Sequence, residues 1–230
     1  MFKKRVIIAH TDIAAAASRA VFGIEHKVAY RTLDIPELAD SKPACVRDQP
    51  ISVRDQDFDQ LQILNCSYEE FSIVVLNTVL SGENCHHVIN KIINECTESN
   101  VEQVIVAAAI RSDPNRSHQL EGLYENCINL APDTEYPPLP SDARISDPVL
   151  NILLQFLIVE KIPTRCLLVA GHKAAIGTAN REDGSLQSIE RLQEAVTSVT
   201  GLKFSLEISK SLVYKGTNAT EDEMSTMIYM

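Results

Sequence analysis

The sequence lacks the short motifs that mark the common enzyme classes. It contains no G-x-S-x-G nucleophile elbow, no G-x-G-x-x-G dinucleotide fingerprint, no P-loop and no H-E-x-x-H zinc motif. Its six cysteines are scattered and none forms a C-x-x-C pair, which indicates reduced and mostly buried thiols. His86 and His87 are neighbours on a predicted helix and point about 100° apart, so they are poorly placed to bind one metal ion. We therefore predict no catalytic residues and no metal site.

Basic runs and long apolar runs are also missing. The 31 acidic residues outnumber the 21 lysines and arginines, and the formal net charge is −10. A chain with this charge repels phosphate backbones, which makes duplex nucleic acid a poor partner. The longest apolar stretch, residues 149–159, is interrupted by Asn151 and Gln155 and falls far short of the ~20 residues that span a bilayer. We expect no membrane anchor.

Alternating strand and helix patterns fill most of the chain. Short continuous apolar runs predict buried strands, whereas spacings of three and four residues predict helices. The expected strands are residues 6–9, 27–33, 71–76, 104–110 and 166–170. The expected helices are an Ala-rich one capped by Asp12 and ended by Gly23, residues 85–96 with Ser81 as cap, residues 148–162 and residues 185–200 with Gly201 after them. This alternation predicts an α/β fold with a mostly parallel sheet and helices on both faces.

Less regular segments separate these elements. Residues 34–60 read as a loop with room for one short strand, and residues 203–214 fit a strand or a helix equally well. The proline-bearing stretch 111–146 predicts a long loop with one helical turn at residues 123–128. We expect one α/β domain over residues 1–214, followed by a flexible docking tail over residues 215–230.

One late helix stands out by its composition. Asp147 and Pro148 form a helix start, with an N-cap and a proline in the first turn, and Pro163 is expected to end the helix. The residues between them are apolar nearly all round, so we expect this helix to be buried on most faces.

Polar side chains follow four of the predicted strands. They are His10 with Asp12, Asn77 with Thr78, Arg111 with Asp113, and His172 with Lys173. Because the carboxyl ends of parallel strands meet at one edge of a sheet, these groups could bind an anion or perform acid-base chemistry. The same residues are also ordinary strand exits and helix caps, which is the stronger interpretation.

The last residues combine a charged stretch with an apolar and aromatic end. Residues 221–223 are acidic, and the chain ends in Met227-Ile228-Tyr229-Met230. Such an end has features that suit a docking peptide, in which Ile228 is an apolar anchor, Tyr229 supplies area and a hydroxyl, and the carboxylate of Met230 meets a lysine. From the tail alone, packing on its own domain is the stronger interpretation.

The tail resembles the hydrophobic–tyrosine–any-residue ending by which proteasome activators and assembly chaperones enter pockets between α subunits. Residues 4–9 with the following helix, residues 104–113, and the passage from Asp147-Pro148 through Lys161-Ile162-Pro163 to the strand 166–170 are similar to the proteasome assembly chaperone 1 family. The resemblance implies a heterodimer with assembly chaperone 2, assembly of the proteasome α ring, no enzyme activity, no cofactor, and a cytoplasmic location that extends to the nucleus. In that case Ile228, Tyr229 and Met230 contact the α subunits.

Two other functions remain open. The first is a small-molecule hydrolase or phosphorylase that uses the polar strand-end residues. The second is an unrelated scaffold whose tail packs on itself.

Overall fold

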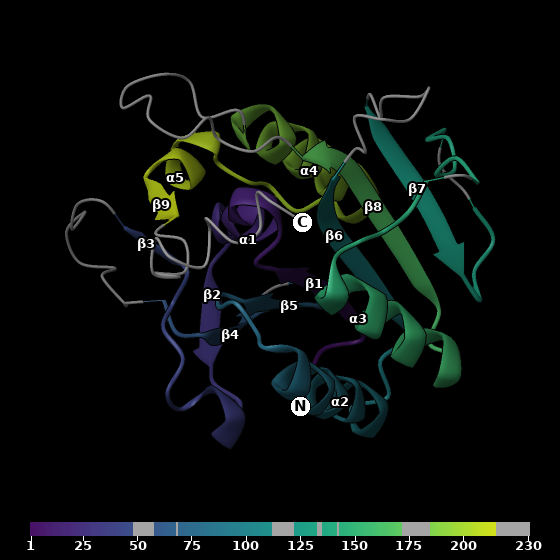
Figure 1. Cartoon of the computed structure of the whole chain (residues 1–230). Helices are drawn as coiled ribbons and strands as arrows, with labels where there is room; N and C mark the ends of the chain where they lie inside the picture. The colour runs from purple at the N-terminus through teal and green to yellow at the C-terminus, as the bar shows by residue number, and fades with distance from the viewer. Residues whose placement is uncertain are drawn as a thin grey trace, which may run out of the picture.

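The fold is built on a sheet whose central strands are continuous apolar runs. The computed structural model describes residues 1–47, 58–67, 69–111, 122–132, 135–141, 143–171 and 185–214. Within them, seven strands form one sheet in the order β2-β4-β5-β1-β6-β8-β7 (Figure 1). Their bounds are β1 Arg5–His10, β2 Val28–Arg31, β4 Leu61–Cys66, β5 Phe71–Leu76, β6 Gln103–Arg111, β7 Leu123–Ile128 and β8 Thr164–Gly171.

Strand directions in this sheet are mixed but mostly parallel. The four central strands β5, β1, β6 and β8 run parallel to one another. β4 runs antiparallel to β5, β2 antiparallel to β4, and β7 antiparallel to β8. β1 lies in the middle, where Ile7 is in register with Ile73 on one side and Ile105 on the other. The predicted α/β fold with a mostly parallel sheet is confirmed.

Helices cover both faces of the sheet. α1 (Ala16–Phe22), α4 (Ser185–Thr200) and α5 (Leu206–Lys210) lie on one face, and α2 (Gly82–Glu98) and α3 (Pro148–Val159) lie on the other (Figure 1). Side chains of β1 alternate between the two apolar clusters that result, because successive strand residues point to opposite faces. Burial on both sides explains why the central strands are apolar at nearly every position.

A small second sheet lies beside the first. β3 (Cys45–Arg47) pairs antiparallel with β9 (Leu212–Tyr214), which follows directly after α5. The stretch 203–214 thus holds both a helix and a strand, and the loop 34–60 holds β3 and the 3-10 helix η2 (Pro36–Leu38). A second 3-10 helix, η1 (Ile13–Ala15), connects β1 to α1.

Several predicted helix ends are confirmed. Asp12 accepts a hydrogen bond from the Ala17 amide in the first turn of α1, and Gly23 ends that helix. Asp147 accepts from the Leu150 amide at 2.8 Å, so it is the N-cap of α3. Ser81 occupies the N-cap position of α2, although its side chain makes no capping hydrogen bond.

Two predictions for the second half of the chain are wrong. Residues 123–128 are not a helical turn but the edge strand β7, because their backbone pairs with β8. α3 is not buried on most faces: only Leu150, Leu153 and Leu157 are buried, whereas Ile158 and Val159 are 55% and 71% exposed. The helix also ends at Val159, before Pro163, and Lys161 follows it in the left-handed conformation. None of the helices in the described part of the chain is long and apolar enough to cross a membrane.

Candidate functional site

The carboxyl ends of the parallel strands define one edge of the sheet, where sequence reasoning places a polar cluster. The chain leaves β1 toward β2, β4 and β5 on one side of the sheet, and it leaves β6 toward β8 on the other side. The crevice between the ends of β1 and β6 is therefore the topological switch point, where doubly wound proteins bind ligands.

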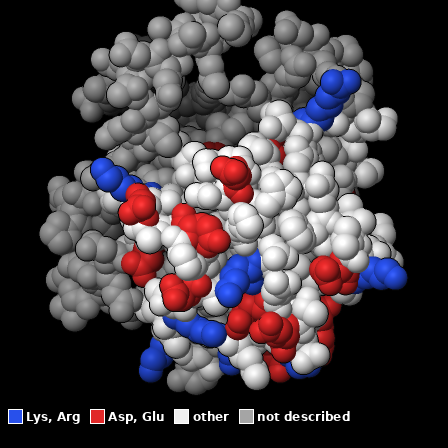
Figure 2. Space-filling model, turned by 60° about the horizontal axis from the view of Figure 1, so that its bottom comes forward, with Lys and Arg blue, Asp and Glu red and all other residues white. Residues whose placement is uncertain are grey.

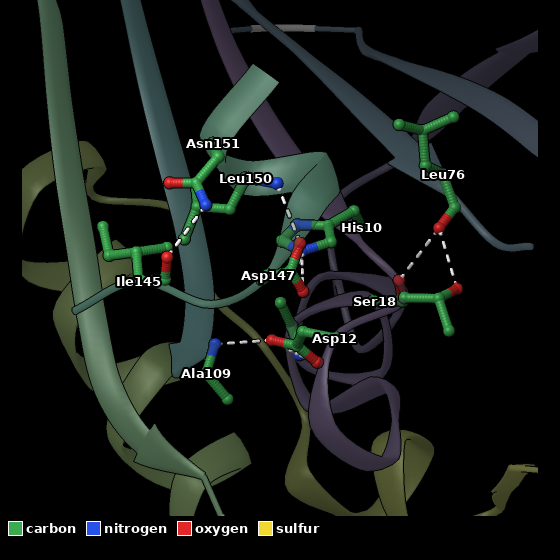
Figure 3. A network of polar contacts seen from close by, with 11 residues as sticks. His10, Asp12, Ser18, Leu76, Ala109, Ile145, Asp147, Leu150 and Asn151 are labelled. Atoms are coloured by element: carbon green, nitrogen blue, oxygen red, sulfur yellow. Dashed lines mark hydrogen bonds and ion pairs between the residues drawn. The ribbon is translucent and has the colours of Figure 1, made fainter. Parts of the chain in front are cut away.

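His10 lies at this point and is paired inside the protein. Its side chain is 1% exposed, and Nε2 lies 3.1 Å from Oδ2 of Asp147 at the start of α3 (Figure 3). Burial by itself lowers the pKa of His10, but the hydrogen bond and charge of Asp147 outweigh it, so the pKa is raised. Burial by itself raises the pKa of Asp147, but the hydrogen bond and charge of His10 outweigh it, so the pKa is lowered. His10 and Asp147 thus join the central strand to α3 through a charge-assisted contact.

Asp12, two residues after the end of β1, connects this strand to α1 and β6. Its carboxylate accepts hydrogen bonds from the amide of Ala17, at 3.1 and 3.3 Å, and from the amide of Ala109 in β6 (Figure 3). The side chain is buried, which raises the pKa of Asp12 to about 7, although His10 and the two amides oppose this shift. The Asp12 carboxyl group therefore bonds the first turn of α1 and the late part of β6 to the end of β1.

Asn77 and Thr78 hold a neighbouring segment in place. The Asn77 side chain accepts from the Cys45 amide at 2.8 Å and donates to the Cys45 carbonyl at 3.1 Å. Thr78 Oγ1 donates to the carbonyl of Lys42 at 3.0 Å. These side chains fix the approach to β3, so their polar groups serve the fold.

The structure brings only part of the predicted cluster together. His10 and Asp12 are close to each other, and Arg111 is the last residue of β6. Asp113, His172 and Lys173 lie outside the described residues. Asp147 was predicted as a helix cap but not as the partner of His10, since no sequence signal links two residues 137 positions apart.

The thiols are poorly suited to nucleophilic chemistry. All six cysteines are free, and all but Cys127 are buried. Burial raises the pKa of Cys45, Cys96 and Cys166 to about 12, so these thiols stay protonated near neutral pH. His86 and His87 are exposed on α2, and no group of three or more metal-binding side chains occurs among the described residues.

A second feature lies on the other side of α3. A groove of about 510 Å³ lies between α3, the edge strand β7 and the segment that follows it. Its lining is mostly apolar and includes Ile128, Leu130, Pro138, Leu154, Ile158 and Leu168. Ile158 belongs both to this groove and to the exposed end of α3.

The predicted docking residues Ile228, Tyr229 and Met230 lie outside the described residues, which end at Tyr214 in β9. Their role in docking stays a prediction.

Comparisons with known proteins show the fold. No protein-family model matches the sequence, and no curated protein matches it. A protein of unknown function from Thermoplasma acidophilum matches with a TM-score of 0.67 and 10% identity, over 100% of this chain and 92% of that one. Two proteins of Pyrococcus furiosus match with a TM-score of 0.57. The first is PbaB, an archaeal proteasome activator, with 12% identity over 99% of this chain and 93% of that one. The second is PbaA, an archaeal homolog of proteasome-assembly chaperone, with 11% identity over 98% and 92%. The chain therefore shares its fold with these three proteins over 98–100% of its length.

Proposed function

We propose that this protein is a chaperone for assembly of the proteasome α ring, similar to assembly chaperone 1. One observation carries the proposal: a chain with the fold of PbaA and PbaB ends in a hydrophobic–tyrosine–any-residue tail. The fold similarity covers 98–99% of the chain, so it is not confined to the common core of α/β proteins.

The tail supplies the proposed contact with the α ring. Ile228 buries alkyl surface in a pocket between two α subunits, which contributes up to about 1.5–3 kcal/mol if the side chain is fully desolvated. Tyr229 packs its ring and orients the tail through its hydroxyl, and the carboxylate of Met230 pairs with a lysine of the pocket. The polar residues 215–226 act as a tether, which raises the effective concentration of the tail once the domain is bound.

The proposed partner is assembly chaperone 2, and the proposed location is the cytoplasm and nucleus. The exposed apolar side chains at the end of α3 support pairing with a second protein, because monomeric proteins rarely expose such residues together with an apolar groove. Co-expression with the second chaperone is expected to raise the soluble yield of this chain.

We infer further that the protein acts by binding and not by catalysis. Asp12, Asn77, Thr78 and Nε2 of His10 are engaged in contacts within the fold, which supports a structural role for the predicted strand-end site, although Nδ1 of His10 is buried without a hydrogen-bond partner among the described residues. Replacing Arg111 and His172 by alanine is expected to leave α-ring assembly intact. Loss of assembly in a variant that stays folded would favour a ligand or enzyme function.

Three changes of the tail test the docking. We expect deletion of residues 228–230, Tyr229→Ala, and addition of one residue after Met230 each to weaken binding to isolated α rings. Met224→Ala is the matched control, since it changes the same tail outside the motif and is expected to bind normally. Fold and pairing with the second chaperone should be unchanged in all four variants. Normal α-ring affinity of both the truncated and the extended chains would refute docking by the chain end.

A further inference from the structure

The last strand before the tail is held by few contacts. Among the described residues β9 pairs only with β3, so the two strands form a separate two-stranded sheet beside α5 (Figure 1). A two-stranded sheet is at best marginally stable by itself. Leu212 belongs to the apolar cluster that contains residues of α1 and α4, whereas Val213 is 38% exposed and Tyr214 is half-buried. The hold on β9 therefore depends on what fixes β3.

Asn77 fixes β3 to the central sheet. It follows β5 directly, it is buried, and its main-chain amide donates to the Gln60 carbonyl at 2.8 Å. Its side chain accepts from the Cys45 amide at 2.8 Å and donates to the Cys45 carbonyl at 3.1 Å. Its main-chain carbonyl accepts from the Ala44 amide at 2.8 Å. Asn77 therefore holds the edge of β3 that faces away from β9.

The register shows how β9 is tied to this anchored strand. The opposed pairs are Cys45 with Tyr214, Val46 with Val213, and Arg47 with Leu212. Because Cys45 turns both of its main-chain polar groups toward Asn77, it does not exchange hydrogen bonds with Tyr214. Hydrogen-bonded and non-hydrogen-bonded pairs alternate in an antiparallel ladder, so Val46 and Val213 form the hydrogen-bonded pair. Within the described ladder one such pair and one buried side chain hold β9, which therefore opens locally at low cost.

The place where the tail leaves the domain is thus set by β3. The tail begins at residue 215, directly after β9. Figure 2 brings the α2 side of the molecule forward, and acidic and basic side chains are mixed on it. A surface of mixed charge gives little long-range orientation toward a partner, so the tail must take its direction from its root. When β9 opens, the tether starts at α5 instead, and its longer and less directed path lowers the effective concentration of the tail.

We propose that β3 and β9 form a clasp that fixes the exit of the docking tail, with Asn77 as the positioning residue that holds the clasp closed. The inference rests on the proposed function, since it concerns the tail that is proposed to enter the α ring. It adds a second state of the molecule. With the clasp open the rest of the domain stays folded, but the tail docks less tightly.

A disulfide tests the clasp itself. In a non-hydrogen-bonded antiparallel pair the Cα atoms lie about 4.5 Å apart, a separation that a disulfide can span. Tyr214→Cys is therefore expected to cross-link to the native Cys45 under mild oxidation of the full chain, and mass spectrometry of its peptides measures the product. Val213→Cys lies opposite Val46 and is the matched control, which should not cross-link to Cys45. A Tyr214→Cys chain that forms no cross-link overturns the clasp.

Binding to isolated α rings tests the positioning of the tail. Val213→Pro removes the amide hydrogen of the hydrogen-bonded pair at an exposed position, whereas Val213→Thr keeps it and is the matched control. We expect Val213→Pro and Asn77→Ala each to weaken binding about 2- to 5-fold, through the lower effective concentration of the tail. The Tyr214→Cys disulfide should return Asn77→Ala to within about 2-fold of the unmodified chain, because it closes the clasp again. Hydrogen exchange should be faster in β9 of Val213→Pro and unchanged in β1, which shows that the domain stays folded.

Truncation separates the possible failures. In chains that lack residues 228–230, neither Val213→Pro nor Asn77→Ala should change the remaining affinity, since there is no tail end to position. Equal weakening in full and truncated chains would show a merely structural role and overturn the proposal. Equal affinity of Val213→Pro and Val213→Thr, in a chain whose binding requires residues 228–230, overturns the clasp but leaves the proposed function standing. If binding does not require residues 228–230, the proposed docking is refuted and the clasp with it.

Discussion

Asp12→Asn should change how the stability of the protein depends on pH. Asparagine keeps one side-chain oxygen, which at the position of Oδ2 can accept from the amides of both Ala17 and Ala109, but it removes the titrating carboxyl group. Folding raises the pKa of Asp12 from 3.8 to about 7, so between these values the folded state holds a proton that the unfolded state releases. The stability that Asp12 contributes is therefore fully present below about pH 4 and is lost as the pH rises through about 7.

The size of the effect follows from this window. One pH unit inside it corresponds to about 1.4 kcal/mol, so the unmodified protein should lose about 2–3 kcal/mol relative to Asp12→Asn between pH 5 and pH 8. Urea unfolding of both proteins at several pH values measures the difference, and subtraction cancels the groups that they share. Asp40→Asn, at an exposed turn, is the matched control for the substitution itself. A flat difference for Asp12→Asn would show that Asp12 is ionised in the folded protein and would refute the reasoning.

Two further predictions concern contacts that hold the helices in place. Asp147→Ala should cost about 2–4 kcal/mol in urea unfolding, since it removes both the cap of α3 and the partner of buried His10, whereas Asp147→Asn keeps the cap and should cost clearly less. Equal costs for the two variants would contradict this. Gly23→Ala should cost about 1–3 kcal/mol, because its Cβ would lie 2.7 Å from the Ser205 carbonyl oxygen. Gly82→Ala is the control, since its Cβ meets no neighbour within 4 Å and should not destabilise the protein. Equal unfolding midpoints for the two variants would show that the Gly23 contact can relax.

The parts of the fold that sequence patterns predicted well are those with local causes. β5 lies inside the sheet with both of its faces buried, so it is apolar at every position except Ser72. α4 shows an apolar stripe with helical spacing. The capping residues Asp12 and Asp147 were predictable because a cap bonds to amides a few residues away.

The features that sequence patterns missed depend on contacts between distant segments. β4 was not predicted, and β7 was predicted as a helical turn although it is an edge strand, because its extended conformation is set by pairing with β8. The apolar composition of α3 predicted burial, yet composition does not tell whether an apolar side faces the core of its own chain or another molecule. The pairing of His10 with Asp147 had no signal in the sequence, because it joins two segments that are far apart in the chain.

The arrangement at the switch point favours a function carried by the protein surface. In doubly wound proteins the ligand commonly occupies the crevice beyond the carboxyl ends of the strands. Here Asp12 accepts hydrogen bonds from the amides of Ala17 and Ala109, and Nε2 of His10 contacts Asp147, whereas Nδ1 of His10 is buried without a hydrogen-bond partner among the described residues. A ligand at this point would have to break these contacts and leave buried polar groups without partners, at a cost of about 1–3 kcal/mol for each group. Contact with the end of α3 requires no such loss, because Ile158 and Val159 are already exposed and apolar. A chain that contacts this end of α3 therefore deprives no buried polar group of the switch point of its partner.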